Sequence, residues 1–137
     1  DIFKIMEFDF ATIEHRLREL AFLNSGVHIL LVDDRYDAKR EIEFCYDGGV
    51  QAYVEYNNRN KVSLHPCISL TAGDEEKGIT LEFAMQWNDS YHENILCFTN
   101  NIRQRDGGTH LSAFKAALTR VINAYAEKRG MTKKMKV

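Results

Sequence analysis

Apolar residues recur at helical spacing near both ends of the chain. In residues 10–24 they are separated by charged side chains, which predicts an amphipathic helix built on Ile13, Leu17, Leu20 and Leu23. Asp9 is the predicted N-cap of this helix, and Asn24-Ser25-Gly26 predicts its end. A longer stripe predicts a second helix over residues 109–129, ended by Gly130. Its apolar residues are Leu111, Phe114, Leu118, Val121, Ile122 and Tyr125.

Between these helices the pattern alternates, as it does in strands. Residues 27–33 are rich in β-formers, and residues 41–46 place Ile42, Phe44 and Tyr46 on one face and Glu41, Glu43 and Cys45 on the other. The polar stretch 34–40 predicts the loop of a hairpin. A short helix is predicted from Val50 to about Asn60, after the Asp47-Gly48-Gly49 turn.

The next segment is predicted to be mostly strand. Residues 67–71 and 78–87 form a second hairpin around a turn at 73–78, and residues 94–99 form a third strand. The strand over 78–87 alternates most regularly, with inward positions at Ile79, Leu81, Phe83, Met85 and Trp87. The order of elements predicts an α+β fold, with a mostly antiparallel sheet and helices packed on one face.

Composition places the chain among ordinary globular domains. Its 137 residues are 45% hydrophobic and 28% charged, which is the size of one domain over residues 1–137. No apolar run approaches the roughly 20 residues of a membrane-spanning helix. Three widely spaced cysteines indicate no disulfide framework and favour a reducing compartment. The first and last residues carry no start or stop signal, so we expect a piece of a longer chain, truncated at both ends.

Charge is distributed unevenly along the sequence. From Arg103 onward there are nine Lys and Arg against two acids, a balance of +7, while the first 102 residues carry nine basic and eighteen acidic residues, a balance of -9. Positive charge gathered at one end of a near-neutral domain is typical of phosphate binding. A solvated helix face with a basic tail gives the same pattern, so charge alone leaves both interpretations open.

Candidate catalytic residues are few. His65 and Cys67 form a close pair without the further ligands of a zinc site or the third group that orients a catalytic base. Asp106-Gly107-Gly108 could offer backbone N–H groups to an anion, but a tight turn with Thr109 as N-cap of the long helix is the favoured interpretation. The residues themselves therefore predict no active site, metal site or bound cofactor in this segment.

Several strings closely resemble the B subunits of bacterial DNA gyrases. They lie in the family's order over nearly the whole chain and are Arg16-Leu17-Arg18-Glu19-Leu20-Ala21-Phe22-Leu23-Asn24-Ser25-Gly26-Val27, Tyr46-Asp47-Gly48-Gly49-Val50, Cys97-Phe98-Thr99-Asn100-Asn101-Ile102 and Gly107-Gly108-Thr109-His110. The resemblance implies the transducer region of an ATP-dependent type II topoisomerase, with a fold similar to the second domain of ribosomal protein S5. The equivalent domain of topoisomerase IV, which shares the Gly-Gly-Thr-His string, is an alternative.

The resemblance also implies a place in a larger machine. A preceding domain binds ATP and Mg²⁺ and dimerises two B subunits, while the transducer relays nucleotide state to the DNA-cleaving parts and surrounds a cavity for double-stranded DNA. This implies gyrase A as a partner, a cytoplasmic location, no membrane contact, and no ATP hydrolysis by this segment alone. The alternatives outside the family are a stand-alone nucleic-acid-binding module on the same S5-like scaffold and a small enzyme using His65 and Cys67.

The family's cavity-lining basic position on the long helix falls on Lys115 by alignment through Gly-Gly-Thr-His. A lysine here suits transient contact with phosphates. Arg120 lies five residues further, about 140° around a helix, and a surface charge explains it equally well. Arg103 and Arg105 complete the predicted DNA-contact set, and Gly107, Gly108 and Thr109 form the predicted turn and helix cap.

Overall fold

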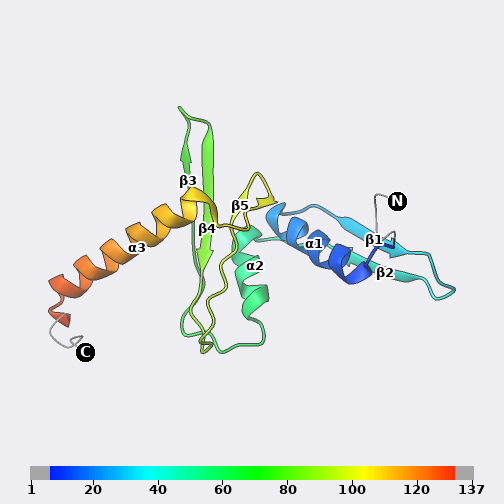
Figure 1. The fold of residues 1–137 in the computed structure, drawn as a ribbon, viewed down its shortest axis with the longest axis horizontal. Helices are drawn as coiled ribbons and strands as arrows, with labels where there is room; N and C mark the ends of the chain where they lie inside the picture. The colour runs from blue at the N-terminus through cyan, green and yellow to red at the C-terminus, as the bar shows by residue number, and fades with distance from the viewer. Residues whose placement is uncertain (1–6, 132–137) are drawn as a thin grey trace. The chain divides into compact units, whose positions relative to one another are not determined.

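The computed structural model describes residues 7–131, and its contacts divide the chain into two compact units, Asp1–Tyr91 and His92–Val137 (Figure 1). Helices and antiparallel strand pairs follow one another along the sequence, so the predicted α+β class is confirmed. The strands of the described residues form three two-stranded sheets. Among these residues no helix is both long and apolar enough to span a bilayer. The prediction of one domain over residues 1–137 stays a prediction.

The first unit opens with a helix and a hairpin. Helix α1 covers Phe10–Leu23, and the Asp9 carboxylate caps it by accepting a hydrogen bond of 2.8 Å from the Thr12 backbone N–H, as the sequence predicted. Strands β1 (Ile29–Asp33) and β2 (Arg40–Phe44) pair antiparallel, with Ile29 opposite Phe44 and Asp33 opposite Arg40. Both the hairpin and its polar loop were therefore predicted correctly.

Arg35, in the loop of this hairpin, forms several hydrogen bonds through its guanidinium group. Two guanidinium nitrogens of Arg35 donate to the two carboxylate oxygens of Asp33 at 2.6 and 2.8 Å, and these bonds lower the pKa of Asp33 to about 2. A third nitrogen donates to the carbonyl of Phe8 at 2.8 Å. Arg35 thus ties the loop to the segment that precedes α1.

Aromatic rings form the core of the first unit. Phe22 of α1 stacks on Tyr46 with ring centroids 3.8 Å apart and on Tyr53 at 5.0 Å. Phe22, Phe44 and Tyr53 are all buried. Glu19 is also buried, and one of its carboxylate oxygens is paired with Arg16. Because α1 contacts both β1 and β2 as well as helix α2 (Gly49–Asn58), this core joins the four elements.

Among the described residues of the first unit, helix α2 packs against one end of the second hairpin. Strands β3 (Ile68–Asp74) and β4 (Ile79–Met85) pair antiparallel, and α2 contacts both. Phe83 and Met85 are half-buried, as their predicted inward positions require. Ile79 and Leu81, near the turn, are 60% and 49% exposed, and Trp87 is also exposed. Their predicted burial is wrong within the described residues, because no element of the first unit covers the outer end of this hairpin.

The second unit consists of a small hairpin followed by a long helix. Strands β5 (Phe98–Thr99) and β6 (Ile102–Arg103) pair across Asn100 and Asn101. These two asparagines have φ values of 48° and 62°, which suit the two central positions of a tight hairpin turn. The predicted strand over residues 94–99 is therefore too long, since only its last two residues pair. Helix α3 then covers Gly108–Lys128.

Candidate functional site

The start of α3 is set by two glycines and an aspartate. Gly107 and Gly108 have φ values of 82° and 64°, a backbone conformation that residues with a Cβ rarely adopt. Gly107 is the N-cap residue, and the Gly108 N–H donates to the Asp106 carboxylate at 3.3 Å. Thr109 is already helical, so its predicted role as N-cap is wrong. The helix is capped two residues earlier, at Gly107, and the Asp106 carboxylate accepts a backbone hydrogen bond in place of a threonine cap.

Close packing also restricts this turn to glycine. A Cβ at Gly107 would lie 2.5 Å from a methyl carbon of Leu111, and one at Gly108 would lie 2.8 Å from the ring of His110. Side-chain movement would be needed in both cases, in addition to the strain of a positive φ. The Gly-Gly pair therefore fixes where α3 begins.

Lys115 lies one to two turns into α3 and is exposed. Its ammonium forms an ion pair with Glu93, with Nζ 3.2 Å from Oε1, between side chains that are 49% and 69% exposed. An exposed pair of this kind contributes about 0–1 kcal/mol, so a stronger anion can displace it. Sequence reasoning did not single out Glu93, because it lies 22 residues earlier and no local pattern connects it with the helix.

The other predicted cations of the second unit are exposed but spread out. Arg103 lies on β6, Arg105 lies in the turn before α3, and Arg120 lies further along the helix. Over residues 92–131 the unit holds six basic residues against the three acids Glu93, Asp106 and Glu127. The arrangement suits attraction of phosphates over a broad surface.

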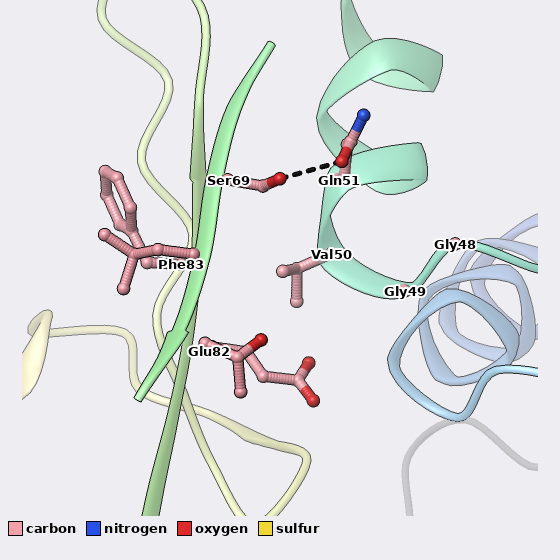
Figure 2. A pocket seen from close by; sticks show the side chains of 9 residues that line it. Gly48, Gly49, Val50, Gln51, Ser69, Glu82 and Phe83 are labelled. Atoms are coloured by element: carbon pink, nitrogen blue, oxygen red, sulfur yellow. Dashed lines mark hydrogen bonds between the residues drawn. The ribbon is translucent and has the colours of Figure 1, made fainter. Parts of the chain in front are cut away.

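The first unit contains a hollow between α2 and the second hairpin (Figure 2). It has a volume of about 430 Å³ and is lined by Gly48, Gly49, Val50, Gln51, Ser69, Leu70, Thr71, Glu82 and Phe83. The Ser69 hydroxyl donates to the side-chain carbonyl of Gln51 at 2.8 Å across this hollow. The Glu82 carboxylate also lies beside the first turn of α2, where its charge would repel a phosphate.

His65 and Cys67 do not form a nucleophile–base pair. His65 Nε2 accepts a hydrogen bond of 3.0 Å from the Trp87 backbone N–H, and its Nδ1 lies 2.6 Å from the Pro66 carbonyl. Both ring nitrogens therefore contact the backbone. The Cys67 thiol is directed at the Met85 carbonyl, 3.6 Å away, and burial raises the pKa of this thiol. This geometry gives no support to a small enzyme using the two residues.

The hollow beside α2 does not fit the phosphates of ATP. The Glu82 carboxylate of β4 lies beside the helix start that borders the hollow, and its negative charge disfavours a triphosphate there. Within residues 7–131, no three His, Cys, Asp or Glu side chains come together in a way that could hold Mg²⁺.

Sequence comparisons point to one family. A family model described as DNA gyrase B matches residues 49–137. The DNA gyrase B subunit of Rickettsia conorii is 65% identical over 99% of this chain, and that of Caulobacter vibrioides is 53% identical over all of it. The chain spans 17% of the length of each of these curated relatives.

Solved structures give the same result for the fold. The 43K ATPase domain of Thermus thermophilus gyrase B, solved in complex with an aminocoumarin, superposes with a TM-score of 0.73 and 33% identity. The B subunit of Myxococcus xanthus DNA gyrase superposes with a TM-score of 0.76 and 25% identity. These alignments cover 95% and 94% of this chain but 35% of each solved chain.

Proposed function

Because the chain belongs to the DNA gyrase B family, we propose that it is the transducer part of a gyrase B protein, within an ATP-dependent type II topoisomerase. Its role would be to couple nucleotide binding elsewhere in the parent chain to strand passage and supercoiling. Small rotations of a stiff α+β element can transmit such a change between distant sites. The reported relatives carry the gyrase name, which favours gyrase over topoisomerase IV.

We propose a coupling role for this part of the parent protein. The Glu82 carboxylate beside the start of α2 disfavours a phosphate at the hollow that the structure shows there. We propose that ATP and Mg²⁺ are bound by other residues of the parent protein. The same parent would dimerise with a second copy of itself when ATP binds, associate with gyrase A, and act in the bacterial cytoplasm.

The observation that carries a DNA-guiding role is the exposed Lys115 on α3. Its ammonium projects from a surface with excess positive charge and is held by one exposed carboxylate, Glu93. Such a lysine can exchange this partner for a passing phosphate without reading base sequence. We propose that Lys115 contacts the transported double strand, together with Arg103, Arg105 and Arg120.

The test is Lys115→Glu in full-length gyrase B assembled with gyrase A. Charge reversal should reduce ATP-dependent supercoiling about tenfold or more while nucleotide binding changes by less than about twofold, because the substitution acts on DNA and not on ATP. Supercoiling is read by gel mobility of a plasmid, and ATP binding is measured by equilibrium titration.

Lys77→Glu is the matched control. Lys77 also forms an exposed ion pair, 2.9 Å from Asp74, but it lies in the turn of the second hairpin in the first unit. This variant should supercoil normally. Equal loss of supercoiling and ATP binding in Lys115→Glu, or no loss of either, would contradict the assignment of Lys115.

A further inference from the structure

We propose that Cys45 is a reactive thiol, activated by His28 and Glu43, that forms mixed disulfides with small cationic disulfides. The three side chains lie on the exposed face of the first hairpin, opposite the face that packs into the core of the first unit. The inference is independent of the proposed coupling role, because it concerns thiol chemistry at a different surface.

The strand register brings these residues together. In the β1–β2 ladder Ile29 lies opposite Phe44 and Leu30 lies opposite Glu43, so residues 28 and 45 face each other one step beyond the ladder. Side chains alternate between the two faces of a hairpin. Phe44 points into the core, whereas His28, Glu43 and Cys45 are all exposed on the opposite face.

The side-chain distances match those of an activated nucleophile. The Cys45 sulfur lies 3.2 Å from His28 Nε2, and His28 Nδ1 lies 3.1 Å from a carboxylate oxygen of Glu43. One assignment of hydrogens satisfies both contacts with a neutral imidazole: Nδ1–H donates to Glu43, and Nε2 accepts from the thiol. The carboxylate then orients the ring and stabilises the imidazolium that forms when the thiol loses its proton.

The reaction is a thiol–disulfide exchange. The Cys45 proton moves to His28 Nε2 while the sulfur attacks one sulfur of the small disulfide and a new S–S bond forms. The original S–S bond breaks, and the departing thiolate takes the proton back from the imidazolium to leave as a thiol. Cys45 is oxidised to a mixed disulfide and half of the reagent is reduced, so no other oxidant is needed.

The charge of this surface selects the class of reagent. Glu43 and Glu41 are exposed carboxylates on the same face of β2 as Cys45. They attract cations and repel anions over several ångströms. A small disulfide with ammonium groups is therefore favoured over one with carboxylates.

The experiment measures the rate of mixed-disulfide formation at each cysteine of the full-length chain at pH 7, by peptide mass mapping. Cystamine is the cationic probe and glutathione disulfide is the anionic one. Each rate is divided by that of an unstructured cysteine peptide with the same reagent. Cys67 and Cys97 are internal comparisons, because burial raises the pKa of both thiols and their reaction should be slow.

We expect the normalised cystamine rate at Cys45 to be about tenfold above that of the peptide, because a positioned base accepts the proton. His28→Ala should return it to the peptide value, and Glu43→Gln should lower it about threefold. Glu75→Gln is the matched control: Glu75 is an exposed carboxylate in the turn between β3 and β4, outside the face that carries Cys45. This variant should keep most of the rate.

Two results would overturn the proposal. A normalised rate in His28→Ala within twofold of the unaltered protein would show that exposure alone explains the reactivity of Cys45. A larger normalised rate with glutathione disulfide than with cystamine would exclude the cationic class. The substituted side chains lie on an exposed face, and circular dichroism on each protein verifies that the fold is intact.

Discussion

The charge of Lys115 is shared with a single neighbouring carboxylate, which affects how strongly its ammonium could attract a phosphate. In this structure its ammonium is paired with Glu93, so part of the positive charge of α3 is already neutralised. The pair is exposed on both sides, and its contribution is small enough for phosphate to compete. If Lys115 contacts DNA as proposed, Glu93 competes with the phosphate for its ammonium.

Glu93→Gln removes this competition. We expect full-length gyrase B to bind duplex DNA about two- to fivefold more tightly at low salt, since an exposed pair is worth up to about 1 kcal/mol. The difference should shrink as salt is raised, because screening weakens both interactions. The measurement is a binding titration at two salt concentrations. Glu127→Gln, which removes the same charge near the end of α3, is the control; an equal gain there would attribute the effect to net charge.

Predictions for single residues succeeded where the chemistry is local. Asp9 was identified as an N-cap because its partner, the Thr12 N–H, lies three residues away. Thr109 was misassigned because the glycines before it had already turned the chain. The contact of Lys115 with Glu93 joins residues 22 positions apart, and that of Cys45 with His28 joins residues 17 positions apart. Local sequence patterns do not predict contacts over such separations.

At the scale of elements, the start of α3 depends on two glycines in the left-handed conformation. Gly107→Ala should loosen the first turn, because a Cβ there is strained by about 1–2 kcal/mol and would also meet Leu111. The expected result is faster amide hydrogen exchange in the first turns of α3 in the full-length protein, with exchange near Lys128 unchanged. Gly130→Ala is the control: its φ is 66°, but a Cβ there has no atom within 4 Å. If amide hydrogens in the first turns of α3 exchange at the same rate in Gly107→Ala as in the unaltered protein, the glycine turn does not determine where α3 begins.

The positions of the hairpins and helices could be predicted from periodicity, but which of their faces are buried by a neighbouring element could not. Alternation identified β4 and its two faces, yet Ile79 and Leu81 are exposed at its outer end. Helical spacing identified α3, yet Val121 and Tyr125 of its apolar stripe are exposed. The hydrophobic period predicts which residues share a face of a helix or strand. Whether that face is buried depends on another element packing against it. The β5–β6 pair is too short for a hydrophobic period to predict it. Its turn is formed by two asparagines with positive φ.

For the whole molecule, the property that most affects DNA binding is the difference in net charge between residues 103–137 and the residues before them. Residues 103–137 carry a balance of +7 and the preceding residues a balance of -9, so attraction of DNA to one part is opposed by repulsion from the other. A chain with this distribution holds DNA well only when something else positions the basic part against it. This favours a coupling element over an independent binding module.

The 137-residue chain by itself should therefore bind duplex DNA weakly, with a Kd above about 10⁻⁴ M near physiological salt, the weak end of non-specific binding. Full-length gyrase B with gyrase A and a non-hydrolysable ATP analogue should bind more tightly, and Lys115→Glu should reduce that gain. Fluorescence anisotropy of a labelled duplex measures both, after circular dichroism establishes that the short chain contains its helices. Salt-sensitive binding with a Kd near ~10⁻⁶ M by the short chain would favour a stand-alone nucleic-acid-binding module, because it would need neither nucleotide nor partner to present its cations.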